Sequence, residues 1–238
     1  MSIVSKIRIK ARSLSEFYFF QSFGIPEIKE DKISKSILKK YLPVNPVIID
    51  CGAHVGIDSI ELYKILGGEV HAFEPVDNIF TQLTKNTSAF SNIHCYKLAL
   101  GDKNGSQFFY VSEGASDASS SLLEPKDHLL DHPNTTFNNK IEVQTLTLDE
   151  WAKIQAITKV DMLWLDMQGF ELNLLKASPK ILSTVQLIHT EVSLKETYKG
   201  VPLYKEYRSF LEGKGFKLAL EAIPSGWDMG NVLFARTK

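Results

Sequence analysis

The sequence has few of the features that mark several common classes of protein. It contains only two cysteines in 238 residues, Cys51 and Cys95, and their spacing fits no metal-binding motif. We therefore expect free thiols in a reduced, cytoplasmic compartment, with Cys51 as a small buried thiol at a strand tip. No apolar run approaches the ~18 residues that a membrane span needs. Basic residues interrupt the apolar groups at residues 1–20, which makes a poor secretory signal and leaves open an amphipathic helix lying on a membrane.

Charge of either sign is not in excess. Lysine and arginine total 27, aspartate and glutamate total 28, and the formal net charge is −1. The sequence also lacks a basic stripe, so we expect no nucleic acid as partner. With 44% hydrophobic residues, the chain can form one sizeable core. The oligomeric state stays open, a homodimer included.

Residues 1–45 read as a helical, polar-rich N-terminal extension, and Pro43 and Pro46 mark its end. From residue 46 to 238, apolar strands alternate with helical segments such as 57–66, which predicts one α/β domain with a mostly parallel sheet covered on both faces. Residues 113–140 form the longest stretch without periodicity, which is typical of a functional loop.

The residues that follow the first two strands predict a nucleoside site. In open α/β sheets, ligands bind at the carboxyl ends of the strands. Asp50, Gly52 and Gly56 follow the first strand, and Ala53 and His54 lie in the same turn. Glycines let a ligand approach the backbone closely. Glu74, followed by Pro75, ends the second strand, where a carboxylate can accept hydrogen bonds from both hydroxyls of a ribose.

The residue type at position 50 distinguishes a site for a dinucleotide from a site for a nucleoside without phosphate. A dinucleotide site has a glycine at this position, so that backbone N–H groups can meet a pyrophosphate. A carboxylate repels phosphate and suits a cationic or zwitterionic ligand. S-adenosylmethionine carries an ammonium and a sulfonium but no phosphate, so it is the expected cofactor.

These motifs resemble those of known enzymes. "DCGAHVG" followed by "AFEP" resembles the cofactor motifs of class I methyltransferases, and "VDMLWLDMQGFELNLLKAS" looks like the FkbM family of O-methyltransferases. "LALGDKNG", "ASDASSSLLEP" and the segment from "LYKEYRSFLEGKGFKL" to "NVLFAR" agree, so the resemblance covers about 47–236. One departure is Leu165, where the family often has lysine.

The resemblance implies a Rossmann-like fold with a mostly parallel seven-stranded sheet, S-adenosylmethionine as methyl donor and a hydroxyl acceptor on a sugar, glycan or glycosylated small molecule. It places the methionine end of the cofactor at the first turn and the ribose at Glu74. It places the adenine near Leu100 and Asp102.

O-methylation needs a base or a metal, because the acceptor oxygen loses its proton as the bond forms. Asp166 is the first candidate, since it follows an apolar strand that can raise its pKa; capping the next helix is the alternative. Glu171, five residues later, is expected to point elsewhere or to act as a cap. His189 and Glu191 share one face of a strand and are further catalytic candidates. No metal site is assigned, but Asp166 and Glu191 would be its ligands.

The acceptor is expected to meet the long loop and the N-terminal segment. Ser119, Ser120 and Ser121 in that loop are candidates for acceptor binding, or are polar residues without that role. Two other functions compete with methyl transfer. One is a nicotinamide-dependent oxidoreductase, which the missing glycine disfavours, and the other is a non-catalytic nucleoside-binding protein.

Overall fold

The computed structural model describes residues 28–29 and 32–237. Its central sheet has seven strands: β3 (Val47–Cys51), β4 (Glu69–Phe73), β5 (Ile93–Tyr96), β9 (Met162–Leu165), β10 (Leu187–Ser193), β11 (Phe216–Ala222) and β12 (Met229–Arg236). Their spatial order is β11-β12-β10-β9-β3-β4-β5. Neighbouring strands from β10 to β5 pair in parallel, and β12 alone runs antiparallel to both of its neighbours. The predicted mostly parallel, seven-stranded Rossmann-like sheet is confirmed.

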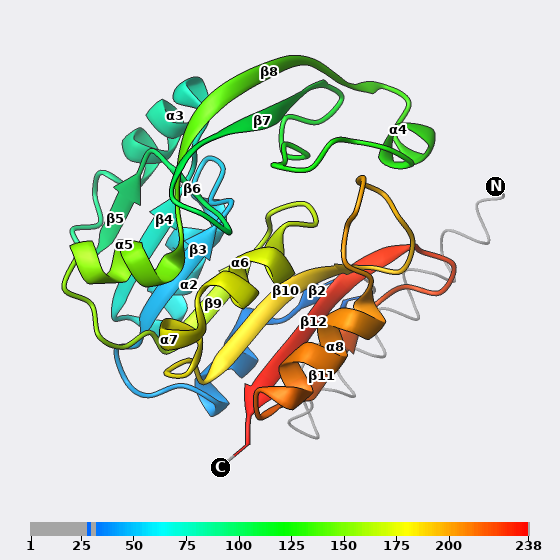
Figure 1. Cartoon of the computed structure of the whole chain (residues 1–238). Helices are drawn as coiled ribbons and strands as arrows, with labels where there is room; N and C mark the ends of the chain where they lie inside the picture. The colour runs from blue at the N-terminus through cyan, green and yellow to red at the C-terminus, as the bar shows by residue number, and fades with distance from the viewer. Residues whose placement is uncertain (1–27, 30–31, 238) are drawn as a thin grey trace, which may run out of the picture.

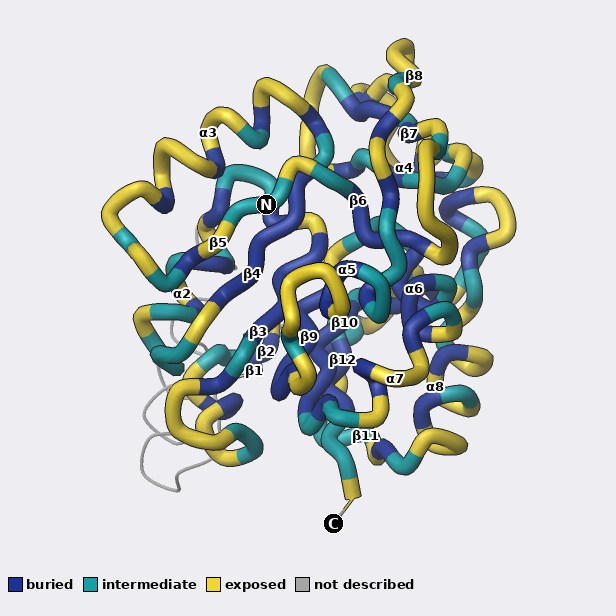
Figure 2. Tube along the Cα trace, turned by 60° about the vertical axis from the view of Figure 1, so that its left-hand side comes forward, coloured by how far each residue is buried: buried dark blue, intermediate teal, exposed yellow. Residues whose placement is uncertain are grey.

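Helices cover both faces of this sheet (Figure 1). The helices are α5 (Leu148–Ile154), α6 (Glu171–Ala177), α7 (Pro179–Leu182) and α8 (Tyr204–Gly213) on one face, and α2 (Ile57–Leu66) and α3 (Asp77–Thr87) on the other. Each face has its own apolar core. Figure 2 shows that the central strands are buried along their length, whereas α3 and α8 alternate between buried and exposed turns. This is the pattern of amphipathic helices that pack one stripe against a sheet.

The segment before residue 45 differs from the prediction. The described part forms a two-stranded pair, β1 (Ile28–Lys29) with β2 (Lys32–Ile33), and a 3₁₀ helix η1 (Lys35–Lys40), rather than one long helix. Ile33, Ile37 and Leu38 are buried in the core on the α2 side of the sheet. Because β2 packs against β11 and β12, this segment is extended although its apolar residues are spaced as in a helix. Residues 1–27 lie outside the described residues, and the helical extension with its boundary at 45 stays a prediction.

A second, three-stranded sheet lies beside the carboxyl ends of the main strands. It consists of β6 (Ala99–Leu100), β7 (Gly105–Gly114) and β8 (Thr135–Leu146), in the order β6-β8-β7, and β7 and β8 extend above the main sheet as an arm (Figure 1). Val76 and Ile79 of the main domain pack with Phe109, Val111 and Val143 of the arm in a third apolar cluster. The loop predicted at 113–140 is reduced to residues 115–134, with the short helix α4 (His128–Asp131) inside it.

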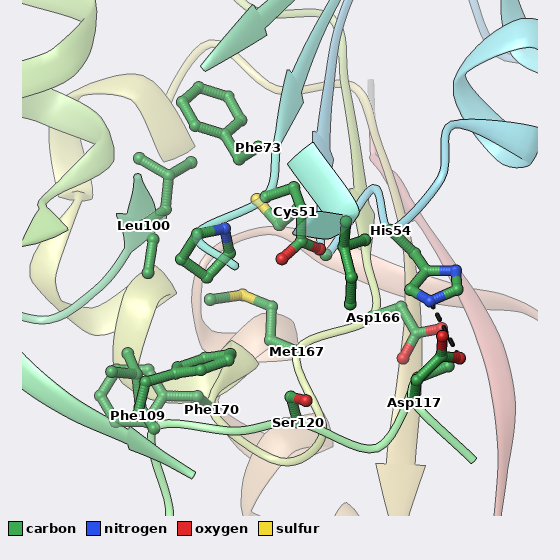
Figure 3. A pocket seen from close by; sticks show the side chains of 17 residues that line it. Cys51, His54, Phe73, Leu100, Phe109, Asp117, Ser120, Asp166, Met167 and Phe170 are labelled. Atoms are coloured by element: carbon green, nitrogen blue, oxygen red, sulfur yellow. Dashed lines mark ion pairs between the residues drawn. The ribbon is translucent and has the colours of Figure 1, made fainter. Parts of the chain in front are cut away.

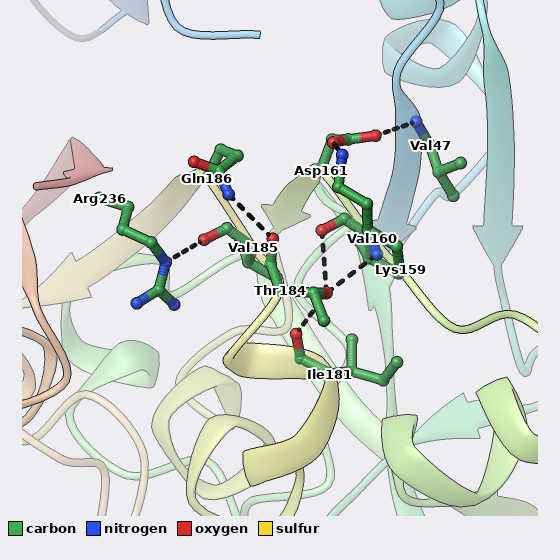
Figure 4. Close-up of polar contacts among 9 residues, drawn as sticks. All are labelled: Val47, Lys159, Val160, Asp161, Ile181, Thr184, Val185, Gln186 and Arg236. Carbon is green, nitrogen blue, oxygen red and sulfur yellow. Dashed lines mark hydrogen bonds and ion pairs between the residues drawn. The ribbon is translucent and has the colours of Figure 1, made fainter. Parts of the chain in front are cut away.

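Polar side chains at the opposite, amino-terminal edge of the sheet have structural partners (Figure 4). Asp161 accepts a hydrogen bond from the backbone N–H of Val47 at 3.0 Å, and Arg236 donates to the carbonyl of Val185 at 2.6 Å. Thr184 donates to the carbonyl of Ile181 at 2.8 Å. These polar groups are therefore satisfied within the protein and fix where the strands begin.

Candidate functional site

A cavity opens where β3, β4 and β9 end, between the main sheet and the arm. The winding of the sheet reverses between β3 and β9, which is where ligands bind in open α/β folds. The cavity encloses about 670 Å³, the space at its mouth included, which is within the usual range for small-molecule sites. Its lining comes from four places: the two strand tips with their turns (Cys51, Gly52, His54, Phe73, Glu74, Pro75, Ile79), the arm (Ala99, Leu100, Phe109), the loop (Asp117, Ala118, Ser120, Leu122) and the turn after β9 (Asp166, Met167, Phe170).

One side of the cavity is apolar and the other is polar. Figure 3 shows Leu100, Phe109 and Phe170 on one side, and His54, Asp117 and Asp166 on the other. A flat apolar slot suits a purine ring. The sequence predicted Leu100 in this position. It missed Phe109, although strict alternation along residues 105–112 would have put Phe109 and Val111 on one buried face.

Glu74 lies at the tip of β4, where a ribose was expected. Its Oε1 accepts a hydrogen bond from the backbone N–H of Val76 at 2.8 Å, and the residue is buried. Burial raises the pKa of Glu74 to about 7, and the backbone hydrogen bonds from Val76 and His54 offset part of that rise. Pro75 lines the cavity beside it. Each carboxyl oxygen has two lone pairs, so Glu74 can accept further hydrogen bonds from a pair of ligand hydroxyls.

The turn after β3 brings backbone close to the cavity. Gly52 has φ +79°, and a Cβ built on it would lie 1.9 Å from the carbonyl oxygen of Asp166. Only glycine therefore fits between the two strand tips. His54 follows in the same turn, and its Nε2 lies 3.1 Å from Oδ1 of Asp117 in the loop (Figure 3). This contact connects the turn to the loop across the polar side of the cavity.

The structure places Asp50 away from the cavity. Its side chain lies on the α2 side of the sheet, where Ser59 donates a hydrogen bond to Oδ2 at 2.5 Å. Burial raises the pKa of Asp50 to about 7; the Ser59 hydrogen bond lowers it, the charges of Asp58 and Asp166 raise it, and Lys35 lowers it. The geometry therefore gives Asp50 a role in joining β3 to α2 rather than contact with a ligand.

Three more of the predicted cofactor residues do not line the cavity. Gly56 has φ +87° and faces the side chain of Leu83 on α3, so it permits helix packing. Ala53 is buried in the core on the α2 side of the sheet. Asp102 is exposed in the turn before β7, where the side chain of Gln107 donates to it at 3.4 Å.

Asp166 follows β9 directly and faces the polar side of the cavity. Its backbone N–H donates to the carbonyl of Cys51 at 3.0 Å, which fixes the turn, and Nε2 of Gln168 donates to its Oδ1 at 2.8 Å. The pKa of Asp166 is raised, chiefly by desolvation, although the hydrogen bond from Gln168 lowers it. Its side chain is exposed at the cavity that it lines. Asp166 is thus both accessible and biased towards taking up a proton.

Glu191 lies on β10, next to Asp166 but outside the main cavity. Nε2 of Gln168 donates to its Oε2 at 3.2 Å, so one amide group contacts both carboxyl groups. Desolvation raises the pKa of Glu191 well above its usual value, and the charges of Asp166 and Glu171 add to the effect. Glu191 therefore holds a proton more readily than an ordinary glutamate.

Glu171 caps the turn after β9, as the sequence predicted. Its Oε1 accepts hydrogen bonds from the backbone N–H groups of Met167 at 2.8 Å and Gly169 at 3.2 Å. Burial raises its pKa to about 7. These contacts hold the turn that carries Asp166, and they leave Glu171 buried on the far side from the cavity lining.

His189 does not reach the cavity either. Its ring stacks on Trp164 with centroids 3.6 Å apart and an angle of 4° between planes. Burial lowers the pKa of His189 to about 3, and the nearby charge of Lys35 lowers it further. A neutral, buried ring that packs against tryptophan is a core residue, so the geometry does not support its predicted catalytic role.

Of the three loop serines, only Ser120 lines the cavity. The hydroxyl of Ser121 donates to the carbonyl of Gln168 at 2.9 Å, and the carbonyl of Ser119 accepts from the hydroxyl of Tyr198 at 2.7 Å. Both serines are buried; Ser121 fastens the loop to the turn after β9, and Ser119 fastens it to the segment after β10. They shape the cavity without facing it.

The charge of the lining is one-sided. Three carboxyl groups, those of Glu74, Asp117 and Asp166, face the cavity, and none of the described lining residues is lysine or arginine. Such a lining repels a diphosphate and favours a ligand with positive charge. The sequence analysis attributed the preference for a positively charged ligand to Asp50. In the structure, Glu74, Asp117 and Asp166 account for this preference instead. Within residues 28–29 and 32–237, no group of three or more His, Cys, Asp or Glu side chains could hold a metal ion.

Comparison with known proteins identifies the family. The family described as "Methyltransferase FkbM domain" matches residues 50–218, more than half of the chain. The chain belongs to this methyltransferase family. S-adenosylmethionine, which the sequence motifs predicted, is the methyl donor of the family, and this excludes the nicotinamide-dependent oxidoreductase as an alternative.

Two curated relatives match nearly their whole length. The 2-O-methyltransferase NoeI of Sinorhizobium fredii is 29% identical over 215 residues, which cover 87% of this chain and 86% of that protein. The methyltransferase sdnD of Sordaria araneosa is 23% identical and covers 90% of this chain and 92% of that one. Among solved structures, magnesium protoporphyrin IX methyltransferase from Synechocystis PCC 6803 is 13% identical, with a TM-score of 0.47 over 85% of this chain and 74% of that one.

Proposed function

We propose that this protein is an S-adenosylmethionine-dependent O-methyltransferase that methylates a hydroxyl of a sugar, glycan or glycosylated small molecule. The observation that carries the proposal is the cavity itself, with an apolar slot at one end, a buried acid at the ribose position and carboxyl groups at the other end. Each part matches one part of the cofactor: adenine, ribose and the positively charged methionine end.

The proposed reaction needs alignment and one proton acceptor. The acceptor oxygen attacks the methyl carbon in line with the carbon–sulfur bond, whose electrons pass to sulfur. The hydroxyl proton moves to a base, for which Asp166 is best placed, because it faces the cavity and its pKa is raised. The loop already forms one wall of the cavity, which limits the access of water to the reacting groups.

The relative that carries a regiochemical name supports a sugar acceptor. NoeI is named a 2-O-methyltransferase, and its 29% identity over 87% of this chain supports methylation of an oxygen at a position numbered 2 here as well. We therefore favour a hydroxyl next to the anomeric carbon. The free thiols Cys51 and Cys95 fit the cytoplasmic location that the sequence predicts. In the part of the chain that the structure describes, no helix is long and apolar enough to span a bilayer.

Two measurements test the proposal. The first is calorimetric titration with S-adenosylhomocysteine and with NAD⁺, where we expect heat from the former alone. The second is transfer of label from tritiated S-adenosylmethionine to a panel of free sugars, glycosides and lipo-oligosaccharides, each beside its 2-deoxy analogue. Label on the parent sugars and none on the 2-deoxy analogues would support the assignment. Binding without transfer to any acceptor would support the non-catalytic alternative instead.

Parallel reactions with EDTA decide whether a divalent ion takes part. Asp166 and Glu191 would be the first ligands to test in that case, since their carboxyl groups both meet Gln168. Activity lost in EDTA and restored by Mg²⁺ would show that an ion is needed.

A further inference from the structure

The side chain of Gln168 connects the two acids at the base of the cavity. Its Nε2 donates to Oδ1 of Asp166 at 2.8 Å and to Oε2 of Glu191 at 3.2 Å. An amide nitrogen carries two hydrogens, so both contacts can form at once. Within the described residues, Gln168 is the group that donates hydrogen bonds to both of these carboxyl groups.

The other end of the amide is oriented as well. Oε1 of Gln168 lies 3.3 Å from the hydroxyl of Tyr198, which can act only as donor there because Oε1 accepts. The same hydroxyl donates to the carbonyl oxygen of Ser119 in the loop at 2.7 Å, so its single hydrogen reaches Gln168 only as the weaker branch of a three-centre bond. The contacts of Nε2 with the two carboxyl groups set which end of the amide faces the acids, and Tyr198 connects this arrangement to the loop that forms the cavity wall.

The backbone conformation of Gln168 is a second observation that its position is tightly constrained. Its φ is +52°, a left-handed conformation that costs a non-glycine residue energy. The turn is nevertheless held from both sides, by Ser121, which donates to the carbonyl of Gln168, and by Glu171, which accepts from the adjacent N–H groups. The surrounding contacts thus maintain a conformation that the residue alone would avoid.

We propose that Gln168 is a positioning residue for methyl transfer, which holds the carboxyl groups of Asp166 and Glu191 together and aims Asp166 at the acceptor oxygen. The inference rests on the proposed function and goes beyond it. Asp166 takes the hydroxyl proton as the carbon–oxygen bond forms, while Glu191 stays outside the cavity and retains its own proton. The proton on Asp166 then leaves through the open mouth of the cavity, and the products are the methyl ether and S-adenosylhomocysteine.

The charged groups around this pair come from every neighbouring element. Asp58 of α2 raises the pKa of Asp166 and His54 of the first turn lowers it. Glu171 of α6 and Asp166 itself raise that of Glu191. None of these groups donates two hydrogen bonds to the pair. Replacing Gln168 should therefore raise the pH at which the two acids ionise, because the hydrogen bonds to their charged forms are lost.

The test compares Gln168→Leu and Gln168→Glu with the exposed control Gln155→Leu. For Gln168→Leu we expect kcat to fall by about 10- to 100-fold, the size of a lost hydrogen bond to a charged group, and KM for S-adenosylmethionine to change by less than about threefold. The acidic limb of the pH–kcat profile should move to higher pH. In Gln168→Glu it should move further, since a third carboxyl group replaces the donor. An unchanged profile in both variants would overturn the proposal, even if kcat falls.

Two additions keep the outcome decisive. Tyr198→Phe keeps the amide but removes the hydroxyl beside its Oε1, so it should show a smaller shift in the same direction; it also serves if Gln168→Leu does not fold. Titration of the Asp and Glu carboxyl groups by ¹³C NMR needs no acceptor. If the wild type methylates nothing, the proposed function fails, while the NMR titration still decides whether Gln168 couples the two acids: a titration identical in Gln168→Leu rejects it.

Discussion

Gly52 at the tip of β3 and Asp166 at the tip of β9 are in direct backbone contact: a Cβ on Gly52 would lie 1.9 Å from the carbonyl oxygen of Asp166. The glycine that lines the cavity at the first turn is thus also the residue that lets the second turn bring its carboxyl group to the same cavity. The cofactor motif and the acid of the family motif are one structural unit.

This contact predicts a large effect for Gly52→Ala. The methyl group must displace the backbone of Asp166, and φ +79° is itself unfavourable for alanine. We expect a loss of about 2–4 kcal/mol in the free energy of unfolding, measured by urea denaturation, together with loss of S-adenosylhomocysteine binding. Gly226→Ala is the matched control, because Gly226 has φ +82° but nothing within 4 Å of the added methyl. Equal losses in both variants would show that strain alone explains the effect.

Because the pKa of Glu74 is raised, we expect the affinity for the cofactor to depend on pH. Its pKa of about 7 in the free protein should fall when ribose hydroxyls donate to the carboxylate, because those hydrogen bonds favour the charged form. Affinity for S-adenosylhomocysteine should therefore rise by about tenfold between pH 6 and pH 8. Calorimetry at a series of pH values measures this. Glu74→Gln should bind more weakly and without that pH dependence, and a wild type that binds equally at both values would contradict the ribose assignment.

Because the pKa of Asp50 is raised, its contribution to the free energy of unfolding should change with pH in the opposite sense from that of an ordinary salt-bridged carboxylate. Burial raises its pKa from 3.8 to about 7, so the folded state favours the protonated form. Its contribution to stability is present below pH 4 and is lost as the pH rises towards 7. Asp50→Asn should lose less stability than the wild type between pH 5 and pH 8, by on the order of 1–4 kcal/mol. Urea denaturation at both values measures the difference, with the exposed Asp102→Asn as control.

If Asp166 is the base, its replacement should slow methyl transfer without weakening the binding of the cofactor. Asp166→Asn keeps the size of the side chain but removes the base, so the rate of methyl transfer should fall by about 100-fold or more while affinity for S-adenosylhomocysteine changes by less than about threefold. In the wild type, kcat should rise with pH as Asp166 ionises. Asp117→Asn, in the loop on the same polar side of the cavity, should weaken binding more than transfer. A fully active Asp166→Asn would assign the base elsewhere.

Local signals predicted the framework well, because they depend on neighbours in the sequence. Helix α2 spans Ile57–Leu66 as predicted, since Gly56 and Gly67 flank it with positive φ. Thr147 caps α5 by accepting from the N–H of Glu150, as the capping-box spacing predicted. The residues at the ends of parallel strands also came together, because those ends share one edge.

Which way each side chain faces was harder to predict. Asp50 and Gly52 are two residues apart, yet one meets Ser59 under α2 and the other meets the cavity, because the chain leaves the strand between them. Asp50 lies in register with Ala72 and Trp164 on the α2 side of the sheet, a relation that exists only once the strands pair. The contact between Gln168 and both acids likewise depends on β9 and β10 lying side by side, so no local pattern could reveal it.

The arm formed by β6, β7 and β8 has a thermodynamic consequence. Its apolar cluster includes Ile79, Ala99 and Phe109, which are also part of the cavity wall, so an adenine ring in the slot would complete the packing of that cluster. Occupancy of the slot and docking of the arm are then linked equilibria. Amide hydrogens of β7 and β8, far along the chain from the glycine turn, should exchange more slowly with solvent deuterium once the cofactor is in place.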